Sequence, residues 1–284
     1  MARSTSSKTG SKTGSKTGAP LGQHFLVDRR IEQRIFEAVR PTSRSVVLEI
    51  GGGPGNMTRL LAERAARVVS VEIDRRLAAK LDEQFADDFR VEILTGDILK
   101  VPIDEIAQRY GVARLLVFGN LPYYITSPIL MRLFANMQVI DRIVVMMQYE
   151  VAMRIIAAPG TSEYGLLSVT CQYYTEPQLL FPIPAHAFNP PPKVVSALVS
   201  MPVRPKMQDL GIQDEADFWI WMRAAFAHKR KTLVNNWKTL APAPVIMAAI
   251  GKEGFDSRIR AEDLSLRELA ILYRNTSLTI RHQA

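Results

Sequence analysis

The sequence is poor in cysteine and histidine and has no long apolar run. Its single cysteine, Cys171, cannot close a disulfide within the chain, and its apolar neighbours predict a small buried side chain. No apolar run reaches the ~18 residues that cross a bilayer, and the start lacks the apolar stretch of a signal peptide. The four histidines show no metal-ligand spacing. We therefore predict a cytoplasmic protein that holds no metal.

Negative charge is in deficit, and the deficit is uneven. The chain has 36 Lys and Arg against 28 Asp and Glu, which gives a net charge of +8. Residues 1–19 and residues 204–284 each carry +4, whereas residues 20–203 hold nineteen charges of each sign. Surplus lysine and arginine at both ends suit a polyanionic partner, because they neutralise phosphates. The alternative is that this charge only keeps the protein soluble.

The same boundaries separate three kinds of sequence. Three copies of Ser-Lys-Thr-Gly cannot bury apolar surface, so residues 1–19 are predicted to be a disordered basic arm. Residues 20–203 alternate strand-like and helix-like segments, which is typical of a mostly parallel sheet with helices on both faces. Residues 204–284 carry apolar stripes at helical spacing and are predicted to be a small all-α domain.

The expected elements follow from apolar periodicity and from capping residues. We predict buried strands at residues 46–50, 67–71, 91–94, 115–118, 143–147, 166–173 and 194–201. We predict helices beginning after Asp28 and at residues 57–65, 75–85 and 128–134. In the C-terminal part, an apolar stripe starts at Phe218, and Ser265 with Glu268 is typical of a capping box.

A glycine-rich segment, Glu49-Ile50-Gly51-Gly52-Gly53-Pro54-Gly55, follows the first predicted strand. Glycines let the backbone turn sharply and approach a ligand closely. The dinucleotide fingerprint does not fit, because Asn56 occupies its last glycine position, and the Lys-Ser/Thr end of a Walker loop is missing. What remains is the pattern of class I S-adenosylmethionine methyltransferases. A loop that only packs a helix onto the sheet is the alternative.

Two carboxylates follow the next strands. Glu72 ends the second strand, about 20 residues beyond the glycine loop, where it can accept hydrogen bonds from both ribose hydroxyls. Asp97 follows the third strand and can accept one from an adenine amine. Either acid alone is more often a solvated turn residue, but their joint placement favours a cofactor site. Asp74 is instead predicted to cap the following helix.

The segment Asn120-Leu121-Pro122-Tyr123-Tyr124 follows the fourth strand, where open α/β sheets bind ligands. A planar amide, a fixed turn and aromatic rings suit a flat base that carries an exocyclic amine. The Asn120 side-chain oxygen and the carbonyl of Leu121 or Pro122 can accept the amine protons. Tyr123 can stack on the base, which contributes roughly 1–3 kcal/mol. Tyr124 is explained equally well by packing.

Six motifs together resemble the ribosomal RNA adenine N6,N6-dimethyltransferase family, in the family's order. They lie at residues 22–26, 49–55, 71–74, 96–98, 120–124 and 188–194. The resemblance spans residues 21 to about 203, and residues 226–236 are similar to the family's C-terminal domain. The sequence is most similar to the branch that modifies the bacterial small ribosomal subunit.

This resemblance implies a Rossmann-like class I methyltransferase fold, followed by a helical RNA- or ribosome-binding domain. It implies that S-adenosylmethionine is held by His24, Leu26, Gly51, Gly53, Glu72, Asp97 and Asn120. It implies a catalytic set of Asn120, Leu121, Pro122, Tyr123 and Phe188. Three prolines are expected to hold Phe188 outward, so that its ring closes the second face of the base. Many relatives have Asn where this chain has His24, which can still hydrogen-bond the cofactor.

The implied substrate is 16S rRNA, dimethylated at two adjacent adenosines of its 3′-terminal hairpin in an assembling 30S particle. We expect the protein to be a monomer. Lys229, Arg230 and Lys231 are expected to contact phosphates, with a solvated helix face as the alternative. Two other interpretations stay open: a large-subunit rRNA methyltransferase and a non-catalytic assembly factor. The helical tail and Leu rather than Ile at position 121 favour the small-subunit enzyme. The intact motifs argue against lost catalysis.

Overall fold

The computed structural model describes residues 23–281 of the chain. The strands are β1 Phe25–Leu26, β2 Val46–Ile50, β3 Arg67–Glu72, β4 Val91–Thr95, β5 Leu115–Asn120, β6 Ile140–Gln148, β7 Gln178–Ile183, β8 Phe188–Asn189 and β9 Ser196–Pro202. The helices are α1 Arg29–Val39, α2 Asn56–Ala62, α3 Arg75–Gln84, α4 Ile103–Arg109, α5 Thr126–Phe134, α6 Tyr149–Ile156, α7 Leu166–Tyr174, α8 Glu215–Ala225, α9 Leu233–Trp237, α10 Ala243–Lys252 and α11 Leu266–Arg281. Short 3₁₀ turns are η1 Tyr123–Ile125, η2 Met137–Val139, η3 Ala185–Ala187 and η4 Ala261–Asp263. The predicted basic arm and Gly22 lie outside the described residues.

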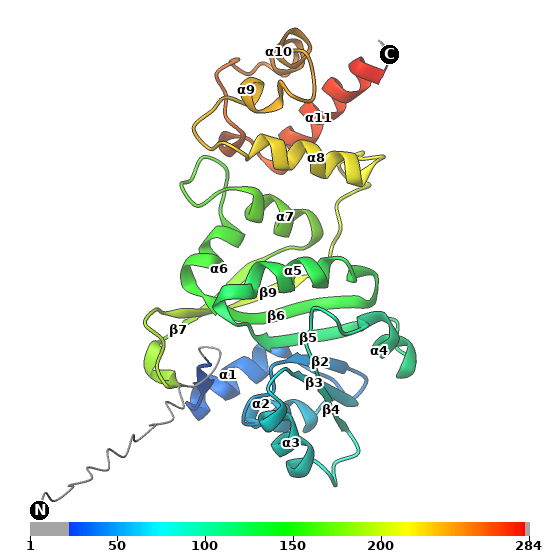
Figure 1. Cartoon of the computed structure of the whole chain (residues 1–284), viewed down its shortest axis with the longest axis vertical. Coiled ribbons are helices and arrows are strands. Elements are labelled where there is room, and N and C mark those ends of the chain that lie inside the picture. Colours follow the sequence, from blue (N-terminus) through cyan, green and yellow to red (C-terminus); the bar gives the residue numbers. More distant parts are fainter. Residues whose placement is uncertain (1–22, 282–284) are drawn as a thin grey trace, which may run out of the picture.

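A seven-stranded sheet organises the molecule (Figure 1). Its strand order is β4-β3-β2-β5-β6-β9-β7, and a separate ribbon pairs β1 with β8. The first five strands in this order are parallel, while β9 runs antiparallel to both β6 and β7. Strands that alternate with helices form such a sheet because each parallel connection must cross over one of its faces. The predicted Rossmann-like α/β class is confirmed.

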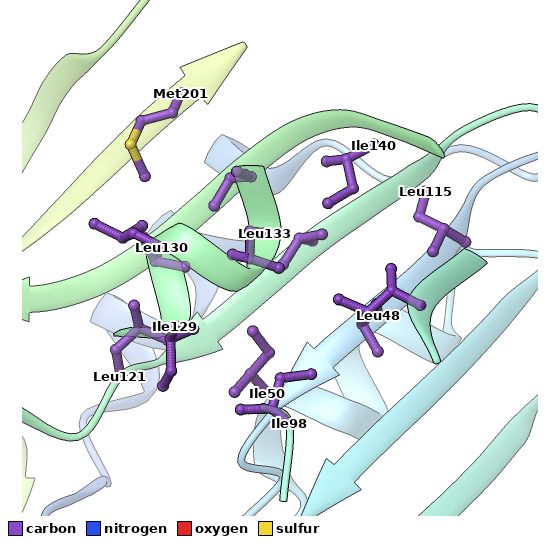
Figure 2. Close-up of a cluster of buried hydrophobic side chains, with 14 of the residues drawn as sticks. Leu48, Ile50, Ile98, Leu115, Leu121, Ile129, Leu130, Leu133, Ile140 and Met201 are labelled. Carbon is purple, nitrogen blue, oxygen red and sulfur yellow. The ribbon is translucent and has the colours of Figure 1, made fainter. Parts of the chain in front are cut away.

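Helices cover both faces of the sheet, because successive residues of its inner strands point into two different apolar clusters. In β2, Leu48 and Ile50 belong to the cluster that contains α4 and α5, whereas Val47 belongs to the cluster that contains α1 and α2. Figure 2 shows the first of these, with Ile129 and Leu133 of α5 over the strands. Strands buried on both faces read as continuous apolar runs, which is why the sequence predicts them correctly.

The predicted capping residues mark where helices begin. Asp28 caps α1 and Asp74 caps α3, each by accepting hydrogen bonds from two backbone amides of the first turn. At the start of α11, the Ser265 amide donates to the Glu268 carboxylate at 2.7 Å, and the Glu268 amide donates to the Ser265 hydroxyl at 3.3 Å. These caps satisfy amides that the helix itself leaves unpaired. The predicted capping box is confirmed.

One predicted strand is wrong. Residues 166–173 form most of α7, with Val169, Cys171 and Tyr173 fully buried. A short apolar run does not distinguish a buried strand from a buried helix, so packing decided the outcome. The strand beside β9 is instead β7, which the pattern hides because it contains Pro182. Proline is tolerated there because β7 is an edge strand.

The C-terminal helices α8 to α11 stack at one end of the molecule, far from α1 to α3 (Figure 1). Their apolar cluster centres on Trp221 and Trp237, whose rings meet edge to face at 4.9 Å between centroids. The predicted stripe of α8 faces this cluster from Phe218 onward. Tyr164 and Tyr173, from the segment around α7, belong to the same cluster. The helical tail is therefore joined to the sheet-bearing part by packing as well as by the chain.

Candidate active site

A cavity opens at the carboxyl ends of β2, β3, β4 and β5, where open α/β sheets bind ligands. Each strand contributes through the residues that end it or follow it, and β1 and α1 close another side. The predicted site residues that line it are His24, Leu26, Gly51, Gly53, Glu72, Asp97, Asn120, Leu121, Pro122 and Tyr123. The sheet therefore brings together groups that stand up to about a hundred residues apart in the sequence.

The glycine loop is shaped for a ligand at two positions. Gly51 has φ +78°, and an added Cβ would lie 3.9 Å from the carbonyl oxygen of Asn120, on the neighbouring strand β5. Gly53 has φ +54°, and an added Cβ would lie 3.1 Å from the Phe25 ring. Residues with side chains rarely adopt such φ values. At these two positions the cavity wall is therefore formed by backbone and not by a side chain.

Glu72 is buried, and both of its oxygens are already oriented by the backbone. The Gly53 amide donates to one oxygen at 3.0 Å, and the Asp74 amide donates to the other at 2.9 Å. Each carboxylate oxygen has a second lone pair left for a ligand donor. Asp97 is similar, because one oxygen accepts from the Leu99 amide at 3.0 Å while the side chain lines the cavity. Both acids therefore present fixed acceptors to a ligand.

The cavity is acidic. Glu32, Glu49, Glu72 and Asp97 line it, and the described lining residues include no lysine or arginine. Burial raises the pKa of Glu49 from 4.5 to about 7, against the hydrogen bond that the Thr58 hydroxyl donates to it at 2.6 Å. Glu32 of α1 accepts a hydrogen bond from the Asn56 amide at 2.7 Å. Such a cavity favours a cationic ligand and disfavours a phosphate.

Asn120 ends β5 with its side-chain amide held in one orientation. Its Nδ2 donates to the backbone carbonyl of His24 at 2.9 Å, so its Oδ1 is the remaining acceptor. His24 is itself held by Pro190, because its Nδ1 lies 2.7 Å from that carbonyl oxygen. The N-terminal segment thus fixes the polarity of the amide on the cavity wall.

Tyr123 lines the cavity from the 3₁₀ turn that follows. Its ring lies nearly parallel to the His24 ring, at 6.0 Å between centroids and 26° between planes. Its hydroxyl hydrogen-bonds the Ser196 hydroxyl at 2.7 Å. Partial burial raises the pKa of Tyr123 and keeps the ring neutral. Tyr124 also lines the cavity, but its side chain is 61% exposed, at the rim.

The structure differs from the prediction at Phe188. Its side chain is only 3% exposed, does not line the cavity and belongs to the apolar cluster of α1 and α2. Phe188 pairs with Leu26 in the β1–β8 ribbon, and this pairing turns its ring toward the core. The three prolines follow Phe188 and do not set the direction of its side chain. In this structure the ring does not offer a face to a base.

The predicted cationic residues lie in the turn between α8 and α9, away from the cavity lining. Lys229 already has protein partners: its Nζ donates to the Ser162 carbonyl at 2.5 Å and lies 3.7 Å from a Glu262 oxygen. Arg230 and Lys231 are exposed, and their side chains make no hydrogen bond or ion pair within the described residues. The three cations therefore differ in their freedom to meet an anion.

Residues 23–281 contain no group of three or more His, Cys, Asp and Glu side chains arranged to hold a metal ion. In the same part of the chain, no helix combines the length and apolar composition that crossing a bilayer requires.

Two contributors to the site were missed by the sequence analysis. Glu32 carried a signal, because it lies three and seven residues before Ile35 and Val39 on the buried face of α1, where a charge is unexpected. Ser196 carried none, because a serine in an apolar strand gives no hint that it meets a tyrosine 73 residues away. The position of Glu32 is visible in the helical pattern of the sequence, whereas the contact between Ser196 and Tyr123 exists only in the folded chain.

Comparison with known proteins agrees with this geometry. Residues 14–274 match the family described as "Ribosomal RNA adenine dimethylase". The chain is 44% identical over 263 residues to "Ribosomal RNA small subunit methyltransferase A" of Koribacter versatilis, covering 89% of this chain and 92% of that protein. It is 43% identical to the protein of the same name from Acidobacterium capsulatum, covering 89% of each.

Two solved structures have a similar fold. A dimethyladenosine transferase from Plasmodium falciparum superposes with a TM-score of 0.73 at 24% identity, over 88% of this chain and 96% of that one. The 23S rRNA methyltransferase ErmE superposes with a TM-score of 0.67 at 25% identity, over 89% of this chain and 99% of that one. The family match covers most of the chain's length and agrees with the cavity and its acceptors. The chain therefore belongs to the ribosomal RNA adenine dimethylase family.

Proposed function

We propose that the protein transfers methyl groups from S-adenosylmethionine to the N6 amines of two adjacent adenosines in the 3′-terminal hairpin of 16S rRNA. It acts as a cytoplasmic monomer on the assembling 30S subunit. The observation that carries the proposal is the orientation of Asn120, whose Nδ2 is taken by the His24 carbonyl. The remaining Oδ1 is an acceptor beside an aromatic ring, which is what an exocyclic base amine requires.

The donor set of the cavity supports S-adenosylmethionine as the methyl donor. Its ribose hydroxyls and adenine amine are hydrogen-bond donors, which match the acceptors of Glu72 and Asp97. Its positive charge matches a lining with Glu32, Glu72, Asp97 and the partly protonated Glu49 and, among the described residues, no lysine or arginine. When bound, S-adenosylmethionine supplies a methyl group that is activated by a sulfonium sulfur.

The chain's own residues then position the amine. Asn120 Oδ1 accepts a hydrogen bond from one amine N–H, and the Leu121 carbonyl accepts one from the other. Leu121 is favoured over Pro122, because the Pro122 carbonyl already accepts from the Ile125 amide at 3.2 Å and from the Thr126 hydroxyl at 3.1 Å. Two acceptors draw the nitrogen toward tetrahedral geometry and free its lone pair. Alignment of this kind contributes about 7–11 kcal/mol. The methylated nitrogen carries a positive charge and releases its proton to solvent after the transfer, so no ionised base is required.

In this proposal, residues 204–284 hold the RNA. We assign residues 20–203 to the methyltransferase domain and residues 204–284 to a helical domain that binds RNA or the ribosome. Arg230 and Lys231 are the better candidates for phosphate contact, because Lys229 is engaged by Ser162 and Glu262. Phosphate contacts of this kind position the substrate without reading its sequence.

A second candidate is methylation of large-subunit rRNA. The observation in its favour is the fold similarity to ErmE, a 23S rRNA methyltransferase, at 25% identity. The small-subunit assignment is better supported, because the relatives that carry that name are 39–44% identical over about nine-tenths of the chain.

One experiment separates these candidates. The protein is incubated with labelled S-adenosylmethionine and either unmethylated 30S particles, unmethylated 50S particles or naked 16S rRNA, and the modified base is mapped. We expect label in 30S particles, on two adjacent adenosines near the 3′ end. Label in 50S particles alone supports the second candidate. Absence of label from every RNA contradicts both and favours a non-catalytic assembly factor.

A further inference from the structure

The hydroxyl of Tyr123 has one protein partner in the described residues, the hydroxyl of Ser196 at 2.7 Å. Ser196 is the first residue of β9 and is 1% exposed. It pairs with Gln148 at the end of β6 and with Ile183 at the end of β7. Paired on both sides, its backbone is rigid, and its hydroxyl lies at the same sheet edge as the cavity.

The turn that carries the Tyr123 ring leaves it only partly buried. The residue lies in η1, a three-residue 3₁₀ turn with no buried residue, and such turns have weak hydrogen-bond geometry. Its neighbour Tyr124 is 61% exposed and gives it no core packing. On the other side, the His24 ring lies 6.0 Å away. The tilt of the Tyr123 ring therefore depends on the hydrogen bond at its hydroxyl end.

We propose that Ser196 is a positioning residue for the proposed base-stacking ring: it holds Tyr123 so that one face of the ring meets the target adenine beside the Asn120 amide. This inference rests on the proposed function. Stacking is sequence-tolerant but requires parallel planes, and displacement of a reacting group by about 1 Å is enough to lower a rate by as much as ~10²-fold. A serine at this position supplies both a donor and an acceptor at the end of a rigid strand.

The chain offers a matched control. Ser200 lies four residues further along β9, on the same face of the strand, and is 6% exposed. It takes no part in the hydrogen bond between Tyr123 and Ser196. Ser200→Ala therefore removes the same atom from the same strand face, without touching Tyr123.

The test compares five proteins: the wild type, Ser196→Ala, Tyr123→Phe, the double variant and Ser200→Ala. Methyl transfer to unmethylated 30S particles is measured as kcat and KM, and S-adenosylmethionine affinity is measured by calorimetry. We expect kcat to fall about tenfold in Ser196→Ala and in Tyr123→Phe, the effect of one lost hydrogen bond. KM for the particle and cofactor affinity stay within twofold, and Ser200→Ala behaves as the wild type.

The double variant distinguishes positioning from general support of the fold. Both single changes delete the same hydrogen bond, the one between Tyr123 and Ser196. The double variant is therefore expected to be no slower than either single variant. Multiplied effects, or a Ser196→Ala variant with wild-type kcat, overturn the inference. Tyr123→Phe deletes the bond from its less buried end, so it carries the test alone if Ser196→Ala does not fold. A wild-type protein that labels no RNA overturns the proposed function itself.

Discussion

The cavity and the turn between α8 and α9 carry opposite charge. Four carboxylates line the cavity, with no lysine or arginine among its described residues, whereas the turn presents Lys229, Arg230 and Lys231 in succession. A cationic methyl donor binds best to a negative surface and a polyanionic RNA to a positive one, because opposite charges attract. The chain as a whole has a surplus of only +8, so the separation matters more than the total.

The two regions also differ in rigidity. Acids of the cavity are held by backbone amides or buried hydroxyls, as at Glu72 and Glu49, and their positions are set by strand ends. In the turn, Lys229 is bonded to the protein, while Arg230 and Lys231 are exposed and make no bond within the described residues. A small ligand benefits from fixed acceptors, whereas a phosphate backbone can be met by exposed cations that no protein contact holds.

The largest effect is expected inside the cavity, at the uncharged Asn120. Asn120→Ala removes the proposed amine acceptor and is expected to lower kcat by 10²–10³-fold, about 3–4 kcal/mol, the typical effect of losing one preorganised hydrogen-bonding group. Calorimetric affinity for S-adenosylmethionine is expected to stay within a few-fold. Asn235→Ala on α9 is the matched control, with wild-type rate. A fully active Asn120→Ala variant contradicts the proposed chemistry.

The acidity of the cavity itself is tested through Glu49. Its pKa rises from 4.5 in the unfolded chain to about 7 in the folded protein, so the folded state binds the proton more tightly. Its contribution to stability is therefore complete below pH 4.5 and declines by about 3 kcal/mol as pH rises from 4.5 to 7. Glu49→Gln is expected to remove that decline from urea-unfolding curves, measured without cofactor.

The exposed Glu83→Gln on α3 serves as the control and should leave the decline in place. Wild-type and Glu49→Gln proteins that lose stability in parallel between pH 4.5 and 7 rule out a buried, partly protonated Glu49.

Cofactor affinity is expected to respond to Glu72. Glu72→Gln removes one of two charged acceptors and is expected to weaken S-adenosylmethionine binding about 10–100-fold, from the loss of roughly 1.5–3 kcal/mol per charged hydrogen bond. Asp74→Asn is the matched control: the residue is two positions away and caps α3 without lining the cavity, and Asn is an equally good cap. Calorimetry checks both variants, and equal affinities contradict the cofactor assignment.

The smallest effect is expected in the basic turn. The double variant Arg230→Ala/Lys231→Ala is expected to bind 30S particles only several-fold less tightly, because each exposed cation contributes about one phosphate contact. The informative measurement is the salt dependence, whose slope should become shallower. Lys229→Ala should change the slope less, since Lys229 bonds to Ser162 and Glu262. An unchanged slope in the double variant indicates that the turn is a solvated face.

Much of the candidate site was predictable because its groups sit at strand ends. The glycine loop, Glu72, Asp97 and Asn120 each follow an apolar run, and parallel strands place such ends at one edge. Phe188 was not predictable, because its direction depends on pairing with Leu26, a residue 162 positions earlier. The helix α7 was not predictable either, since its apolar run fits a strand equally well.

By itself, the sequence determined the parallel sheet, the helix caps and the chemical groups at each strand end, because these depend on local periodicity and on neighbouring residues. Only the tertiary structure decided how those groups are aimed. The Asn120 amide is oriented by His24, 96 residues away, and the Tyr123 hydroxyl by Ser196, 73 residues away. Such contacts join segments that meet only after the sheet has formed. The burial of Phe188 and the separation of the acidic cavity from the basic turn arise in the same way.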